Sequence, residues 1–397
     1  MSVRKREWTN KSGEHSAWIV DYVDAAGKRH IETFERKKDA DEFHATVKVD
    51  VRQDLHTPKN KSITVAEAAE DWISYVKLEK REQSTVEQYR QHVDIHIVPR
   101  IGREKLANLT TPRINKFRDD ILSGMSRAMA KKVLTSLKSL LRDAKRRGNV
   151  AQNVALDVKI KADKRGKKRL KVGVDIPTTE DIQKILHAAS DDDRPLLLTA
   201  IFTGLRSSEL RGLTWDDVDL KAGEIHVRQR VDRYNVVGKP KSESGNRTIP
   251  IGRMVVSALC EWKVRSPKGE GNLVFANGVG KFENHSNLVQ RVWCPVQIAA
   301  GVTVPVKDAS GKQKRDEEGR PEVEAKYTGL HALRHFYASL CINRKLDGGL
   351  ELPAKVVQER LGHSSIVMTM DIYGHLFPRT DDGKELAEAE RALLNVI

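Results

Sequence analysis

The stretch from Leu361-Gly-His-Ser-Ser365 to Asp371-Ile-Tyr-Gly-His375 carries the strongest indication of fold and function in this chain. Tyr373 alone would indicate nothing, because a single tyrosine near a C-terminus is usually a packed or half-exposed aromatic. Two motifs precede it, in the order Thr203-Gly-Leu-Arg-Ser-Ser-Glu-Leu210 and His331-Ala-Leu-Arg334. Four motifs in one order, at workable separations, argue against a chance match.

The composition points to an anionic partner. Lys and Arg number 70 against 55 Asp and Glu in 397 residues, a formal charge of +15, and nucleic acid is the commonest partner of such a chain. No signal peptide, spanning segment, lipidation signal or basic amphipathic anchor is evident, so we expect a soluble, cytoplasmic protein with no membrane partner. Cys260, Cys294 and Cys341 form no Cys-x-x-Cys pair, which argues against a disulfide framework or zinc ribbon.

The four motifs resemble the signature of the tyrosine recombinases, the phage integrase family. The resemblance implies an α+β, multidomain fold with a small N-terminal β-sheet-plus-helix module, a four-helix core-binding domain, and a mainly helical catalytic domain with a small antiparallel sheet. It implies a site-specific DNA recombinase that integrates or excises a phage or mobile element through a 3′-phosphotyrosyl intermediate, without cofactor or metal. The implied partners are double-stranded DNA attachment sites, a synaptic homotetramer, and accessory DNA-bending or directionality proteins.

The residue types in the motifs suit transesterification at a phosphodiester. Arg206 and Arg334 match the family's phosphate-binding arginines, whose planar guanidiniums stay protonated beside the charge of the transition state. His331 shares a helical face with Arg334 and would help to accept the tyrosine proton and bind phosphate. His363 matches the family's next phosphate-binding position. Tyr373 is the implied nucleophile, and its phenol, with an ordinary pKa of about 10, needs positive charge and an acceptor nearby.

The leaving 5′ oxygen needs a proton, and the family supplies it from a lysine on a β-hairpin. The stretches Gly223–Arg228 and Arg247–Ile251 read as flanking strands. Between them, Lys241 is favoured over Lys239 because Ser242 follows it, as in the family's pattern. The choice stays open, since hairpin register cannot be fixed from sequence.

A metal site is the alternative interpretation of His331 and His335, which lie one helical turn apart. No Glu follows His331, and no carboxylate or Cys ligand stands at a suitable spacing. The spacing therefore argues against a metal site.

Residues 1–58 predict an arm-type DNA-binding module. Ala17–Val23 and Arg29–Phe34 read as strands, and an apolar stripe that starts at Ala40 predicts a helix from Lys38. Basic residues among the strands resemble the module that many phage integrases carry at the N-terminus. A structural cap with solvated charges is the alternative.

Residues 62–158 predict a helical core-binding domain. Thr64-Val-Ala-Glu67 and Ser84-Thr-Val-Glu87 read as capping boxes, and Thr111-Pro112 as an N-cap with proline at the first helical position. The helix predicted over Arg127–Arg147 has an apolar face opposite a basic one, which indicates either DNA binding or a merely solvated surface.

Residues 159–175 predict a basic linker that lies along phosphates, and residues 176–397 the catalytic domain. Within the latter, Val304–Lys326 predicts a hairpin or loose loop without an assigned role, and no internal repeat is visible. The helix predicted over Lys384–Leu394 would contact a neighbouring protomer.

Three rival functions share some of these features. A catalytically inactive DNA-binding regulator would keep the basic surface, but it would have no reason to keep all six matches to the family's catalytic residues. A metal-dependent nuclease would need a carboxylate cluster. A type IB topoisomerase-like enzyme shares the chemistry and would relax supercoils without two specific sites.

Overall fold

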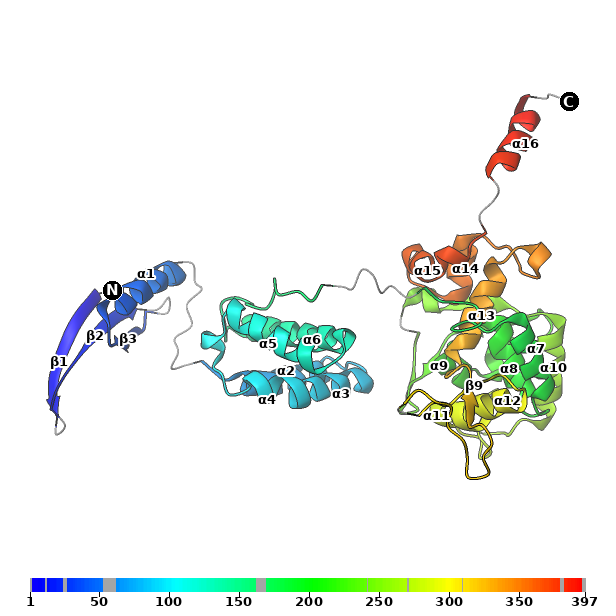
Figure 1. Cartoon of the computed structure of the whole chain (residues 1–397), viewed down its shortest axis with the longest axis horizontal. Coiled ribbons are helices and arrows are strands. Elements are labelled where there is room, and N and C mark those ends of the chain that lie inside the picture. The colour runs from blue at the N-terminus through cyan, green and yellow to red at the C-terminus, as the bar shows by residue number, and fades with distance from the viewer. Residues whose placement is uncertain are drawn as a thin grey trace. The chain divides into compact units, whose positions relative to one another are not determined.

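The computed structural model describes residues 2–10, 13–23, 27–52, 62–161, 169–240, 242–269, 271–308, 310–378 and 382–394 (Figure 1). Two compact units, Met1–Arg165 and Gly166–Ile397, make up the chain, and each is treated by itself. Lys241 and residues 162–168 of the predicted linker lie outside the described residues. Within the described ranges, no helix is both long and apolar enough to cross a membrane.

The N-terminal module is a three-stranded antiparallel sheet in the order β1-β2-β3, with one helix against it. Its elements are β1 (Ser2–Asn10), β2 (Gly13–Val23), β3 (Arg29–Phe34) and α1 (Lys37–Arg52). Val20 and Tyr22 of β2 pack with Ala40 and Val47 of α1 in a small core. Sequence analysis did not predict β1, because its run of charged residues gives little apolar alternation.

The helical segment that follows has a continuous apolar core. Its helices are α2 (Val65–Leu78), α3 (Gln83–Gln91), π-helical η1 (His92–Ile97), α4 (Val98–Ile101), α5 (Thr111–Gly124) and α6 (Arg127–Arg146). Trp72, Phe117 and Leu137, from three of these helices, are buried in that core. The apolar face predicted for the last helix is therefore the face that packs inward.

The observed helix starts in this segment agree only partly with those predicted from the sequence. The Thr64 capping box is confirmed: the amide of Glu67 donates to Thr64 Oγ1 at 3.2 Å, and the amide of Thr64 donates to the Glu67 carboxylate at 2.7 Å. The Ser84 box is wrong, because α3 begins one residue before Ser84 and has no side-chain cap.

The expected cap at Thr111 is wrong by one residue. Thr110 precedes α5, and its hydroxyl accepts from the amide of Arg113 at 3.4 Å. Pro112 therefore lies in the first turn, where its missing N–H costs no helical hydrogen bond.

The second unit is mainly helical, with the buried helix α8 in its core (Figure 1). Its helices are α7 (Thr179–Ala188), α8 (Arg194–Thr203), α9 (Ser207–Arg211), α10 (Arg253–Arg265), α11 (His285–Asn287), π-helical η6 (Leu288–Trp293), α12 (Cys294–Ala299), α13 (His331–Ile342), α14 (Ala354–Leu361), α15 (Ile366–Tyr373) and α16 (Asp382–Leu394). Because α8 packs against both α10 and α13, the segment that follows α8 is held close to α13.

A small antiparallel sheet, in the order β4-β5-β8, completes this unit. Its strands are β4 (Val218–Asp219), β5 (Glu224–Val227) and β8 (Arg247–Pro250), and the connection carries a further hairpin of β6 (Arg230–Val231) and β7 (Val237–Gly238). Glu224 pairs with Pro250 and Val227 with Arg247. The two flanking strands predicted from the sequence therefore pair with each other.

Residues 303–325 form a hairpin with two similar turns near its end. Strands β9 (Thr303–Pro305) and β10 (Val323–Ala325) pair at its base. Asp308 Oδ1 accepts from the amides of residues 310 and 312, and Asp316 Oδ1 accepts in the same way from the amides of residues 318 and 320. Each Asp carboxylate therefore stabilises its own turn.

Candidate active site

The break between α8 and α9 sets the position of Arg206. Gly204 ends α8 in the left-handed region, at φ 59°, and a Cβ there would lie 2.4 Å from the Tyr337 ring. Only glycine fits both the conformation and the space. The chain then turns so that Arg206 directly precedes α9.

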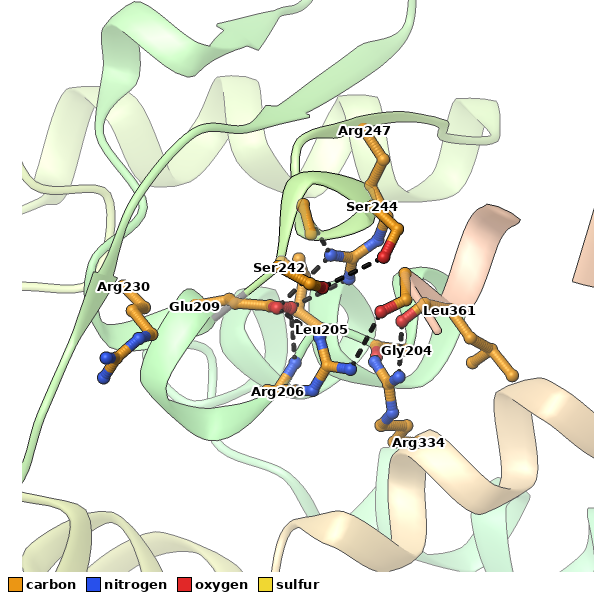
Figure 2. Close-up of polar contacts among 12 residues, drawn as sticks. Gly204, Leu205, Arg206, Glu209, Arg230, Ser242, Ser244, Arg247, Arg334 and Leu361 are labelled. Atoms are coloured by element: carbon orange, nitrogen blue, oxygen red, sulfur yellow. Dashed lines mark hydrogen bonds and ion pairs between the residues drawn. The ribbon is translucent and has the colours of Figure 1, made fainter. Parts of the chain in front are cut away.

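Glu209 connects two arginines beneath this turn (Figure 2). Arg206 donates to its carboxylate through Nη1 at 2.7 Å and through the backbone amide at 2.9 Å. Arg247 of β8 donates to the same carboxylate at 2.8 and 3.2 Å. Sequence analysis did not assign Arg247 to the site, because its position after the hairpin gives no sign that it faces α9.

The carboxylate of Glu209 stays ionised across the working pH range. Burial raises its pKa, but the hydrogen bonds and charge of Arg247 and the charge of Arg206 outweigh burial and lower the pKa to about 2. The carboxylate thus holds both guanidiniums in place as a fixed counter-charge.

Arg334 is 2% exposed and donates to two backbone carbonyls. Its Nη1 reaches the carbonyl of Gly204 at 2.7 Å, and its Nη2 reaches that of Leu361 (Figure 2). Burial and the charge of Arg206 lower its pKa to about 9, so the guanidinium is still protonated at neutral pH. The contact with Gly204 places this side chain beside the turn that carries Arg206.

A second left-handed glycine brings His363 to the same place. Gly362 ends α14 at φ 62°, and its carbonyl accepts from Arg206 Nη2 at 3.1 Å. A Cβ on Gly362 would lie 2.8 Å from the Arg247 guanidinium. His363 is buried, with Nδ1 2.9 Å from the Thr369 hydroxyl. Burial and the charges of neighbouring arginines lower the pKa of His363 to about 4.

Tyr373 ends α15 inside this cluster and is 1% exposed. Its ring lies parallel to that of His363, with centroids 6.2 Å apart. Its hydroxyl lies 2.7 Å from Nδ1 of His335. Burial raises the pKa of Tyr373 to about 12, although the charges of Arg334 and Arg206 act in the opposite direction.

His331 lies at the first residue of α13 and is exposed. Its ring meets that of His335 edge-on, with centroids 4.6 Å apart. The protein around the imidazole still desolvates it in part, and this, together with the charges of Arg334 and Arg206, lowers the pKa of His331. From the sequence, His335 was considered only as a metal ligand; its spacing of one turn from His331 was the available signal that it faces the site. Among the described residues, no group of three His, Cys, Asp or Glu side chains could hold a metal ion.

The lysine positions are described only in part. Lys239 is exposed, and its carbonyl accepts from Arg230 Nε at 3.2 Å. Lys241 lies outside the described residues, although Ser242 and Ser244 beside it hydrogen-bond to each other at 2.9 Å. The arrangement therefore brings together Arg206, His331, Arg334, His363 and Tyr373 from three parts of the sequence, and it leaves the choice of lysine open.

The cluster brings the phenol of Tyr373 together with three imidazoles and with the guanidiniums of Arg206 and Arg334, while Arg247, bound to Glu209, adds a third guanidinium. The guanidiniums can bind two oxygens of a phosphate and stabilise the charge that develops during phosphoryl transfer. The phenol is a nucleophile once its proton is removed.

The phage integrase family model matches residues 177–379, about half of the 397-residue chain. The chain belongs to the phage integrase family. It is a tyrosine-type site-specific DNA recombinase.

Two relatives extend the similarity beyond the matched region. A tyrosine recombinase XerC-like protein of Caldanaerobacter subterraneus is 25% identical over 336 residues, which cover 80% of this chain and 81% of the relative. The ICEBs1 integrase of Bacillus subtilis is 23% identical over 402 residues, with 98% of both chains covered.

Solved structures share the fold at low sequence identity. The Tn1549 transposon integrase in complex with transposon right end DNA has a TM-score of 0.60 at 19% identity, covering 83% of this chain and 100% of that one. The lambda integrase tetramer bound to a Holliday junction has a TM-score of 0.52 at 16% identity, covering 94% and 96%.

Proposed function

We propose that Tyr373 attacks the scissile phosphate of a DNA attachment site, forms a 3′-phosphotyrosyl bond and releases a 5′ hydroxyl. The observation that carries this proposal is the convergence of Tyr373 with His335 and Arg334 in one cluster. The 5′ hydroxyl of a partner strand then attacks the phosphotyrosine and joins the exchanged strands. Because the bond energy is kept in the phosphotyrosine, the reaction needs neither ATP nor metal.

In this mechanism Arg206 and Arg334 bind the non-bridging oxygens of the phosphate. His331 and His363 each add a hydrogen bond to the same group. Lys241 protonates the leaving 5′ oxygen, with Lys239 as the alternative. Glu209 and Arg247 hold Arg206 in position without themselves contacting the DNA.

The remaining domains extend the DNA contact. Residues 1–58 form an arm-type binding module, residues 62–158 a core-binding domain, residues 159–175 a basic linker, and residues 176–397 the catalytic domain. Arg4 and Arg29 support the first assignment, since 59% and 63% of their side chains are exposed on the sheet, although both pair with Asp21. An incoming phosphate would compete with or share the Asp21 carboxylate for these two guanidiniums.

The working assembly is a homotetramer on two attachment sites, with α16 in contact with a neighbouring protomer. The lambda integrase tetramer on a Holliday junction supports this proposal by its shared fold. The ICEBs1 and Tn1549 integrases support an element-borne recombinase, one that integrates or excises mobile DNA with accessory proteins.

Trapping a covalent adduct tests this function. The protein is incubated with nicked candidate-site DNA in the presence of a chelator, and the products are separated under denaturing conditions. A protein–DNA adduct of the 3′ end is the expected result. Binding without an adduct would indicate an inactive regulator, and dependence on a divalent cation would indicate a nuclease. Relaxation of supercoils without two specific sites would indicate a topoisomerase.

A further inference from the structure

His335 makes the hydrogen-bonding contact with the hydroxyl of Tyr373. Its Nδ1 lies 2.7 Å from that oxygen, and the two rings meet at an interplanar angle of 63°. The contact joins two elements far apart in the sequence, since His335 lies in α13 and Tyr373 ends α15. A contact of this length with the reacting oxygen is within reach for direct proton transfer.

We propose that His335 is a catalytic residue that accepts the proton of Tyr373 during strand cleavage and returns it during joining. The inference rests on the proposed function, because it takes Tyr373 as the nucleophile. In this proposal His335 accepts the proton, and His331 binds the phosphate.

The other two histidines are placed less well for this role. Nδ1 of His363 already lies 2.9 Å from the Thr369 hydroxyl, and its ring is parallel to that of Tyr373. His331 reaches the tyrosine only through its edge contact with His335. His331 is also exposed, as a group that meets incoming DNA would be.

The surroundings of His335 keep its imidazole neutral before the reaction. Arg334 adds positive charge from α13, as does His331 when it is protonated, Asp175 adds negative charge from the segment before α7, and Tyr373 faces it from α15. Burial, followed by the charges of His331 and Arg334, lowers the pKa of His335 to about 4, and Asp175 opposes this only partly. A neutral ring with Nδ1 unprotonated offers a lone pair to the phenol.

The proposed step balances in atoms and charge. The Tyr373 O–H bond breaks while a bond forms from that oxygen to phosphorus, and His335 Nδ1 takes the proton. The bond from phosphorus to the 5′ oxygen breaks, and that oxygen takes a proton from the general acid. The imidazolium is offset by the negative charge that the phosphoryl group gains between Arg206 and Arg334. Joining reverses each transfer.

The test measures single-turnover adduct formation by His335→Gln and His335→Ala between about pH 6 and 9. The substrate carries a 5′-bridging phosphorothiolate, because a thiolate leaves without a proton and the general acid no longer affects the rate. DNA binding is measured alongside. Gln keeps a polar partner for Tyr373, so His335→Gln retains the local fold.

The expected loss is on the order of a hundredfold or more at neutral pH, with DNA binding unchanged. The wild-type rate should be flat with pH in this window, whereas the rates of the variants should rise about tenfold per pH unit as phenolate forms. Free imidazole should partly restore His335→Ala. If His335 had only a structural role, the rates of the variants would keep the pH dependence of the wild-type rate, and free imidazole would restore nothing.

Two controls distinguish a failure of the proposal for His335 from a failure of the proposal for Tyr373. His226→Gln, at a half-buried histidine of β5 that contacts the Thr248 hydroxyl, should behave as wild type. An adduct formed by Tyr373→Phe would overturn the proposed nucleophile itself. If Tyr373→Phe is inactive while the His335 variants cleave normally, or lose activity equally at every pH without rescue, the proposal for His335 alone is overturned.

Discussion

The floor of the active site and its rim hold their charges in different ways. The floor consists of Arg334, Glu209, Arg247 and Tyr373, whose side chains or whole residues are at most 5% exposed. The rim consists of Arg206, His331 and Lys239. There the Arg206 side chain is 35% exposed, and His331 and Lys239 are exposed as well.

The floor side chains are buried and held by contacts within the protein, whereas the rim side chains also reach solvent. Arg334 is held by two carbonyls, and Arg247 is held by a carboxylate and by the carbonyls of Gly245 and Arg360. Arg206 shares its guanidinium between Glu209 and the Gly362 carbonyl and still reaches solvent. Substitutions in the floor should therefore affect both folding and chemistry, whereas those of Arg206 and His331 in the rim should affect chemistry alone.

The largest effect should come from Tyr373→Phe, which removes only the nucleophilic oxygen. We expect no covalent adduct, together with wild-type DNA binding. Stability should fall by no more than about 1 kcal/mol, because the substitution removes a single hydrogen bond, the one to His335. Gel analysis under denaturing conditions and thermal unfolding are the measurements. Persistent adduct would remove Tyr373 from its assigned role.

The next effect is on folding and concerns Arg247→Met. The variant leaves the Glu209 carboxylate buried without its main partner, which should cost about 3 to 5 kcal/mol of unfolding free energy. Chemical denaturation measures this cost. The double variant with Glu209→Gln should recover a large part of it, because the uncompensated charge is gone.

Arg230→Met is the matched control, because Arg230 donates to a carbonyl at the protein surface and points away from Glu209 (Figure 2). We expect a change within about 0.5 kcal/mol. Equal losses for Arg230→Met and Arg247→Met would contradict the assignment of the buried Arg247–Glu209 pair as the source of the stability.

A smaller effect on folding should separate Arg334→Lys from Arg206→Lys. Both should cut strand cleavage by on the order of a hundredfold or more, because a point charge replaces a bidentate fork. Only Arg334→Lys should also lose stability, by about 1 to 3 kcal/mol, since it leaves a buried carbonyl without a donor. Single-turnover cleavage and unfolding measured on the same preparations test this. Near-normal cleavage by either variant would mean that its arginine has a structural role.

The smallest effect on folding is expected at the lysines. Lys241→Ala should cleave ordinary DNA poorly, and a 5′-bridging phosphorothiolate should restore much of the rate, because the thiolate leaves without a proton. Lys239→Ala should cleave both substrates about equally well. If the sulfur substrate rescues Lys239→Ala and not Lys241→Ala, the assignments are reversed.

The sequence predicted those parts of the molecule that depend on local pattern. Thr64 and Glu67 form the predicted capping box, and the strands that contain Glu224 and Arg247 pair as expected. The one-residue error at Thr111 and the missed strand β1 show the limits of such patterns. Thr110 and Thr111 can both cap a helix, so the sequence does not decide between them. The charged residues of β1 leave no clear alternation of apolar and polar side chains.

The parts of the site that sequence analysis missed depend on contacts between residues distant in sequence. Arg247 meets Glu209 across 38 positions, and His335 meets Tyr373 across the same separation. Neither pair has a spacing that a single sequence reveals. Gly204 and Gly362 were recognised inside their motifs, but the Tyr337 ring and the Arg247 guanidinium that require glycine there are brought close only by the fold.

The identity of the amino acid attached to DNA tests the account most directly. Wild-type protein is trapped on nicked attachment-site DNA, digested with protease and nuclease, and the nucleotide-bearing peptide is sequenced by mass spectrometry. We predict a 3′-phosphonucleotide on Tyr373, in the peptide that contains Asp371-Ile-Tyr-Gly-His375. Attachment at any other residue, or cleaved DNA with no attached peptide, would contradict the account.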